Sequence, residues 1–193
     1  MPYNDKPSGD APDFVYTIYI AANIDTVWDG LINKEVTKQY WGRHNKSDWK
    51  LGSKWEHIRT DGSNIVDIHG EVLEIDPPRK LVVTWNAPDN HKNRESAPSV
   101  VTYELVALGP DTKITVTHSQ LNADSVMYNG VTEGWQAVMS TLNLYWKPVS
   151  HYRLTSGVRS QSRSIKVTHE RPLSPKNGHS SYFQCFRNLQ SVF

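Results

Sequence analysis

The hydrophobic side chains near the start of the chain follow two different spacings. Residues 14–20, FVYTIYI, place large apolar or aromatic side chains on one parity and are rich in β-branched types, which predicts a strand. The next apolar side chains recur on one helical face, and they are Ile24, Val27, Trp28, Leu31 and Ile32. Asn23 precedes them in a capping position, so a short amphipathic helix is expected. A second short helix is predicted from about Lys34 to Tyr40, ended by Gly42, because glycine readily adopts the left-handed conformation of a helix C-terminus.

Five further segments have the β-branched and aromatic composition of strands. They cover about residues 54–59, 65–75, 80–85, 100–108 and 113–119. Turn residues separate most of them, at Asp61-Gly62, at Asp76-Pro77-Pro78 and at Gly109-Pro110-Asp111. Strands that follow one another through short turns predict an antiparallel meander.

A long helix is predicted at the end of this region. Its apolar side chains share one stripe and are Val131, Trp135, Val138, Met139, Leu142 and Tyr145. The helix is expected from about Asn129 to Trp146, where Pro148 stops it. We therefore predict an α+β fold, in which an antiparallel sheet of about six or seven strands wraps round a long C-terminal helix and two short helices follow the first strand.

Charge divides the chain near Trp146. Residues 1–146 hold 13 Lys and Arg against 19 Asp and Glu, whereas residues 147–193 hold 8 against 1, so the formal charges are −6 and +7. All seven tryptophans lie in the first part. We expect a disordered N-terminal tail over residues 1–12, one folded domain over residues 13–146 and a basic disordered tail over residues 147–193.

The sequence also argues against several classes of protein. Cys185 is the one cysteine, so an internal disulfide and a multi-cysteine metal cluster are excluded. No apolar run approaches the length of a membrane-spanning helix, and the first fourteen residues lack the apolar stretch of a signal peptide. We expect a cytoplasmic protein without a membrane partner.

Several short motifs, taken in their order along the chain, are similar to those of a known family. They are Tyr40-Trp41-Gly42, LGSKWE at 51–56, Asp61-Gly62, GEVLEIDPP at 70–78, LVVTW at 81–85 and Gly134-Trp135. Over about residues 13–142 the chain resembles the START-like, or SRPBCC, superfamily and within it the group of homologues of the heat-shock-protein-90 ATPase activator. The resemblance implies the helix-grip fold, with a deep cavity between the sheet and the last helix.

The resemblance leaves the function open, because this superfamily includes lipid carriers, hormone-binding proteins and cyclases. The leading hypothesis is a monomer or homodimer that binds a small apolar or aromatic ligand in the cavity. One alternative is co-chaperone-like stimulation of a heat-shock-protein-90-type ATPase, and another is a small enzyme of the cyclase or aromatase kind. The eukaryotic co-chaperone carries a further N-terminal domain, whereas twelve residues precede the predicted fold here, which weighs against a chaperone as the partner.

Strand alternation and helix parity select the candidate ligand-binding residues. If Trp55 points inward, His57 and Arg59 share its face. Neighbouring strands, the last helix and the helix pair complete the set, which is Trp41, Trp55, His57, Trp85, Tyr103, His118, Trp135 and Met139. Large aromatic side chains at such positions are also ordinary core residues, so the alternative is a filled core.

His57 and His118 are the candidate catalytic residues, because two imidazoles can serve as general acid and base near neutral pH. The alternative for each is a neutral histidine that is hydrogen-bonded within the fold. We expect neither a metal nor a cofactor, since the sequence has no HxH or HExxH, no P-loop, no GxGxxG and no GxSxG motif. The basic tail has no repeated motif or regular aromatic interleaving, so no nucleic-acid partner is expected.

The resemblance ends abruptly near Asn143, and we interpret the remainder of the chain as the product of a reading-frame change. Members of the group usually end in a sequence like Leu-Glu-Thr-Gly-Lys-Pro-Leu. The codons that can encode residues 143–153 permit this ending when they are read from the third base of the first codon. The alternative is a real basic extension. We predict that the coding DNA, reread in the shifted frame from codon 143, contains the family ending followed by a stop codon; its absence from the other frames would contradict this interpretation.

Overall fold

The computed structural model describes residues 11–89, 91, 94–123 and 125–146. Its elements are β1 Phe14–Ile20, α1 Ile24–Ile32, α2 Lys34–Tyr40, β2 Arg43–Ser47, β3 Lys54–Arg59, β4 Val66–Asp76, β5 Lys80–Trp85, β6 Ser99–Leu108, β7 Asp111–Ser119 and α3 Val126–Trp146. This is the predicted α+β helix-grip architecture, and the predicted order of strand, helix pair, strands and long helix is confirmed. Among the described residues, no helix is long and apolar enough to cross a membrane.

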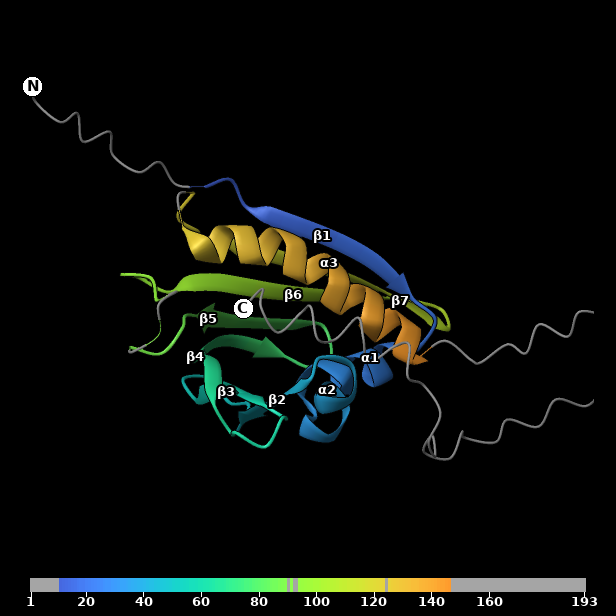
Figure 1. Ribbon diagram of the computed structural model, residues 1–193. Helices are drawn as coiled ribbons and strands as arrows, with labels where there is room; N and C mark the ends of the chain where they lie inside the picture. Colours follow the sequence, from blue (N-terminus) through green and yellow to red (C-terminus); the bar gives the residue numbers. More distant parts are fainter. Residues whose placement is uncertain (1–10, 90, 92–93, 124, 147–193) are drawn as a thin grey trace, which may run out of the picture.

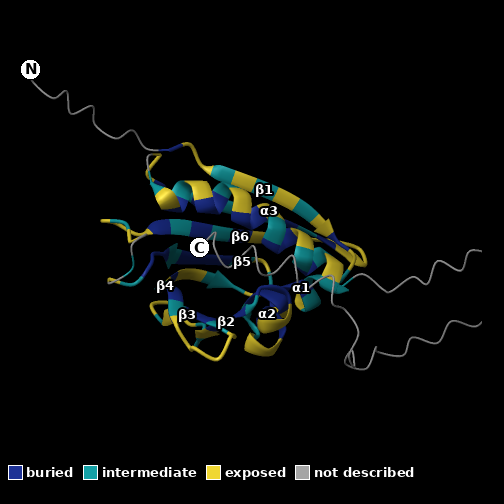
Figure 2. Cartoon of the chain, in the orientation of Figure 1, coloured by how far each residue is buried: buried dark blue, intermediate teal, exposed yellow. Residues whose placement is uncertain are grey.

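One seven-stranded antiparallel sheet carries the fold, in the order β1-β7-β6-β5-β4-β3-β2. The helix α3 lies across the face of this sheet, and α1 and α2 sit together near the C-terminal end of α3 (Figure 1). Buried positions alternate with partly or fully exposed ones along most of β6 and β7, as expected of strands with one face on the core (Figure 2). The interior therefore lies between the sheet, α3 and the helix pair.

The helix ends follow the predicted capping chemistry. The Asn23 side chain accepts a hydrogen bond from the Thr26 N–H at 2.9 Å and caps α1. Trp41 caps the C-terminus of α2, and Gly42 follows with φ of 69°, a left-handed conformation that favours glycine. The α3 helix begins at Val126 rather than near Asn129, because the Ser125 hydroxyl accepts from the Tyr128 N–H at 3.0 Å and caps an extra turn.

The strand β4 bends the sheet at two β-bulges. One extra residue, Asp67, stands where β3 steps from His57 to Ile58, and a second irregularity lies between Val72 and Glu74. Bulges increase local twist and redirect side chains. The first of them coincides with the inward placement of the Asp67 carboxylate, whose residue is 1% exposed.

The strand β2 was absent from the sequence prediction, which located six strands before the last helix where the structure has seven. Its sequence, RHNKS, contains no apolar side chain, and its buried positions are Arg43 and Asn45. These polar side chains are buried because other parts of the chain supply their hydrogen-bonding partners. At the other end of the domain, Ala11 falls within the predicted N-terminal tail yet is buried, and its N–H donates to the Leu121 carbonyl at 3.0 Å. The predicted tails over residues 1–10 and 147–193 lie outside the described residues.

Candidate functional site

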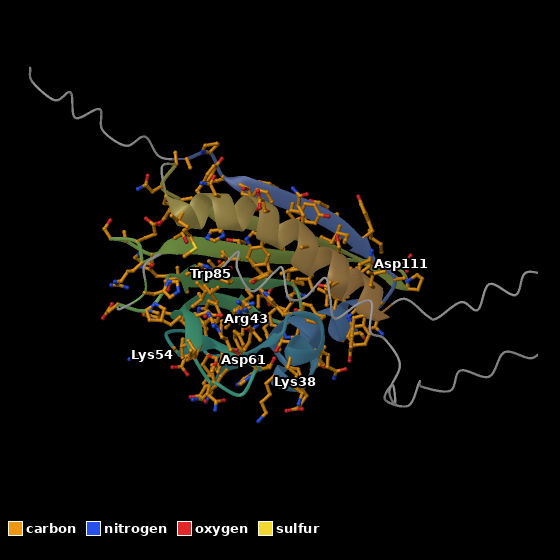
Figure 3. The ribbon with its side chains drawn as sticks, viewed as in Figure 1. Lys38, Arg43, Lys54, Asp61, Trp85 and Asp111 are labelled. Carbon is orange, nitrogen blue, oxygen red and sulfur yellow. The ribbon has the colours of Figure 1, made fainter. Side chains whose placement is uncertain are left out.

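Seven of the eight predicted ligand-binding residues form one buried cluster of rings. They come from β3, β5, β6, β7, α3 and the end of α2, and they are Trp41, Trp55, His57, Trp85, Tyr103, His118 and Trp135. The ring centroids of Trp55 and Trp85 are 5.2 Å apart, and those of Trp85 and Trp135 are 5.5 Å apart. Trp85, labelled in Figure 3 near β5, is buried and contacts the ring of Trp135 on α3. The eighth residue, Met139, is fully buried on α3.

The Trp55 indole depends on a glycine of the neighbouring strand. Its Nε1–H donates to the Thr84 carbonyl at 2.9 Å, and the ring crosses the position of Gly70. A Cβ atom at Gly70 would lie 1.9 Å from the Thr84 oxygen and 2.5 Å from Trp55 Nε1. Glycine is therefore required at this position for Trp55 to face the interior.

His118 is held by a complete chain of hydrogen bonds. Trp135 Nε1–H donates to His118 Nδ1 at 3.1 Å, so His118 Nε2 carries the hydrogen and donates to Ser99 Oγ at 2.7 Å. The Ser99 hydroxyl in turn donates to the Trp85 carbonyl at 3.1 Å. Burial lowers the pKa of His118 to about 3. Both ring nitrogens are thus engaged in a neutral imidazole, and His118 is a structural histidine.

His57 is held on one side only. Its Nδ1 lies 2.6 Å from Asn45 Oδ1, and the Asn45 amide nitrogen donates to the Leu31 carbonyl at 2.9 Å. Burial, followed by the positive charges of Arg43 and His44, holds the pKa of His57 well below its usual value. His57 Nε2 is buried and has no hydrogen-bond partner within the described part of the chain.

A buried ion cluster lies on the same strands. Arg43 Nε donates to Asp67 Oδ2 at 2.6 Å, and Arg59 Nε donates to Asp67 Oδ1 at 2.7 Å. Arg43 and Arg59 are cross-strand partners in β2 and β3, which is why the bulged Asp67 reaches both. One carboxylate between two guanidinium groups leaves a formal charge of +1, and Figure 3 places Arg43 on the inner side of the domain. The Asp67 carboxylate compensates much of this buried charge, but Arg43 Nη2 is buried and has no hydrogen-bond partner among the described residues.

A small cavity of about 10 Å³, room for one water molecule, lies where α1 meets β2, β3, β5 and β6. It is lined by Leu31, Asn45, Trp49, Trp55, Leu81, Val83 and Tyr103. Two of the predicted residues, Trp55 and Tyr103, are among them. The sequence pattern placed Leu31 on the apolar face of the first helix and Leu81 and Val83 in a strand, without assigning them to a site. It did not predict β2, so Asn45 and Trp49, which follows this strand, were not candidates.

The two candidate catalytic histidines do not form an acid–base pair. Each ring contacts Trp85, with centroid distances of 6.0 Å for His57 and 5.8 Å for His118, and each is hydrogen-bonded to a different partner. Their lowered pKa values keep both rings neutral at pH 7, so neither is a general acid there. Of these two rings, His57 is the one that keeps an unpartnered nitrogen, Nε2, among the described residues of the aromatic interior.

The sequence of this chain matches the model of a known protein family. The model of the family described as "Activator of Hsp90 ATPase homolog 1-like protein" matches residues 21–147. A comparison with curated proteins finds no match.

Solved structures of similar fold come from several species. CalU16 from Micromonospora echinospora is 22% identical, with a TM-score of 0.55 over 74% of this chain and 80% of that chain. The HSP90 activator PFC0360w from Plasmodium falciparum is 24% identical, with a TM-score of 0.52 over 69% of this chain and 91% of that chain. The Aha1 dimer from Colwellia psychrerythraea is 15% identical, with a TM-score of 0.56 over 70% of this chain and 96% of that chain. At these identities the likeness establishes the shared fold.

Proposed function

The chain belongs to the family of activator of Hsp90 ATPase homolog 1-like proteins, and we propose that it binds one small apolar or aromatic molecule in the interior between the sheet and the helices. The observation that carries this proposal is the cavity lined by residues of α1, β2, β3, β5 and β6. Its walls combine apolar side chains such as Leu31 and Val83 with the polar groups of Asn45 and Tyr103. An apolar enclosure with a few polar groups is the usual composition of a small-molecule site.

The binding of a ring-sized molecule requires the surrounding side chains to move, because the cavity is far smaller than the hundreds of Å³ of a typical ligand site. Trp49 is the lining side chain best suited to this movement. It lines the cavity from the connection between β2 and β3, it is only half-buried, and connecting segments are more mobile than strands. In this account the ligand enters as Trp49 moves outward, while Trp55, held by Thr84, stays in place.

Binding of an apolar fluorescent probe, N-phenyl-1-naphthylamine, tests the proposal. We expect one probe per chain, with a change in tryptophan emission because tryptophan rings surround the interior. Replacing the buried Met139 by Trp should fill interior space and weaken binding about tenfold or more, at a cost in stability of about 1 to 3 kcal/mol.

The matched control is Val106→Trp, since Val106 is 45% exposed on β6 and should accept the same ring without changing affinity. If Met139→Trp does not fold, Leu31→Phe adds bulk to the cavity wall instead. No binding by the folded wild-type protein, or unchanged affinity in both interior variants, would refute the proposal.

Chaperone binding is a second candidate, favoured by family membership and by the similarity to an HSP90 activator. Exposed apolar side chains on β1 and β6 offer a surface for it that is separate from the interior, and they are Val15, Tyr19, Val106 and Leu108. Because the two functions would use different surfaces, ligand binding and stimulation of a chaperone ATPase can be measured independently.

A further inference from the structure

The hydrogen-bond partner of His57 determines which nitrogen of the ring carries the hydrogen. Asn45 is oriented by its own bond, because its amide nitrogen donates to the Leu31 carbonyl and its Oδ1 therefore faces His57. An amide oxygen only accepts, so His57 Nδ1 must carry the hydrogen. In the neutral ring Nε2 is then a bare acceptor. The lowered pKa of His57 supports this neutral form.

A second unpartnered polar atom lies in the adjacent ring. Trp41 Nε1–H is buried and has no hydrogen-bond partner among the described residues, and an indole nitrogen only donates. The Trp41 and His57 ring centroids are 4.4 Å apart in an edge-on arrangement. Leaving a buried donor and a buried acceptor unpaired is costly, and such groups commonly indicate a bound molecule. The two rings together present one acceptor and one donor.

We propose that an aromatic ligand with a hydroxyl group extends from the cavity past Asn45 and Trp55, which line it and contact His57. The ligand donates its O–H to His57 Nε2 and accepts from Trp41 Nε1. This inference rests on the proposed ligand-binding function and specifies the chemistry of the ligand. Trp55 and Trp85 also flank His57, with ring centroids 6.3 Å and 6.0 Å away, and provide aromatic surfaces for the ring of the ligand.

A neutral hydroxyl group fits this pair better than a charged group does. A carboxylate has no hydrogen to donate to His57 Nε2. An ammonium group has no lone pair for Trp41 Nε1, and it would be repelled by Arg43, whose charge acts on His57. A hydroxyl group both donates and accepts, so it satisfies both atoms. Asn45 acts as a positioning residue, because it fixes the hydrogen on His57 Nδ1.

The test compares 2-naphthol with 2-methylnaphthalene, which has the same ring and a methyl group in place of the hydroxyl. Titrations of the full chain at pH 7.5 should show 2-naphthol binding about tenfold or more tightly. In the variant His57→Phe the ratio should fall to near one, while the affinity for 2-methylnaphthalene stays within about twofold. The control is His69→Phe. His69 Nε2 also has no partner among the described residues, but its strand partner is Glu56, so it lies on the sheet face opposite Trp55 and His57. This variant should keep the wild-type ratio.

A measurement on the wild-type protein covers the case in which His57→Phe does not fold. With ¹⁵N-labelled histidine, the His57 Nε2 resonance should shift on addition of 2-naphthol in the direction of an accepted hydrogen bond, and should shift less with 2-methylnaphthalene. Equal affinities in the wild type, a ratio retained by His57→Phe, or an unmoved Nε2 resonance on 2-naphthol binding would overturn the inference and leave the ligand-binding function standing. Failure of both probes to bind would contradict that function, and the inference with it.

Discussion

Replacing Trp135 by alanine is expected to lower the free energy of unfolding by about 3 to 5 kcal/mol, with a further loss of about 1 kcal/mol or more from the hydrogen bond. The first part follows from burial, because Trp135 is fully buried and its ring contacts those of Trp41, Trp85 and Tyr103. The second part arises because His118 Nδ1 would lose its donor inside the core. A reversible denaturant titration measures the sum.

Trp135→Phe separates the two contributions. Phenylalanine keeps a ring on α3 but has no N–H group, so this variant should lose about 1 to 3 kcal/mol, mainly through the unpaired His118 acceptor. A loss below about 1 kcal/mol for Trp135→Ala would mean that this ring does not fill the interior, and the assignment of the inner face of α3 would be wrong.

Acidification from pH 7 to pH 5 should destabilise the protein by about 2 kcal/mol through His118, and further through His57. Burial holds the pKa of His118 to about 3 and, with the charge of Arg43, that of His57 well below its usual value. Well above pH 6.5, the usual pKa of histidine, both rings are neutral in the folded and the unfolded chain. Below pH 6.5 the unfolded chain takes up protons that the folded chain does not, so His118 costs about 1.4 kcal/mol per pH unit and His57 adds to this loss.

His57→Gln tests the origin of this pH dependence. Glutamine does not titrate, so the variant should lose only about 2 kcal/mol between pH 7 and pH 5, which is the share of His118. Unfolding free energies are to be compared at each pH for the variant and the wild type. Equal stability of the wild type at pH 7 and pH 5 would show that the two imidazoles are not buried in the neutral form.

Most of the fold could be predicted from the sequence because its elements have clear periodicities. The parity of Trp55 and His57, and the stripe that carries Trp135 and Met139, correctly placed these side chains toward the interior. These patterns depend only on local geometry, namely two residues per strand repeat and 3.6 per helix turn.

The polar interior could not be predicted in the same way. The strand β2 buries Arg43 and Asn45, and their partners Asp67, His57 and Leu31 are distant in sequence. Asp67 points inward at a β-bulge, which alternation cannot anticipate. The roles of the two histidines were also inaccessible, because the hydrogen-bonding partner of each ring, Ser99 and Trp135 for His118 and Asn45 for His57, is set by strand register and helix packing.

Locating a bound probe decides whether the interior between the sheet and the helices accepts a small molecule. Intermolecular nuclear Overhauser effects between N-phenyl-1-naphthylamine and the labelled protein report which side chains it contacts. If the ligand binds in the interior, the probe contacts the cavity residues Leu31, Trp55 and Val83. Contacts confined to the exposed outer side chains Val15 and Tyr19 would contradict it.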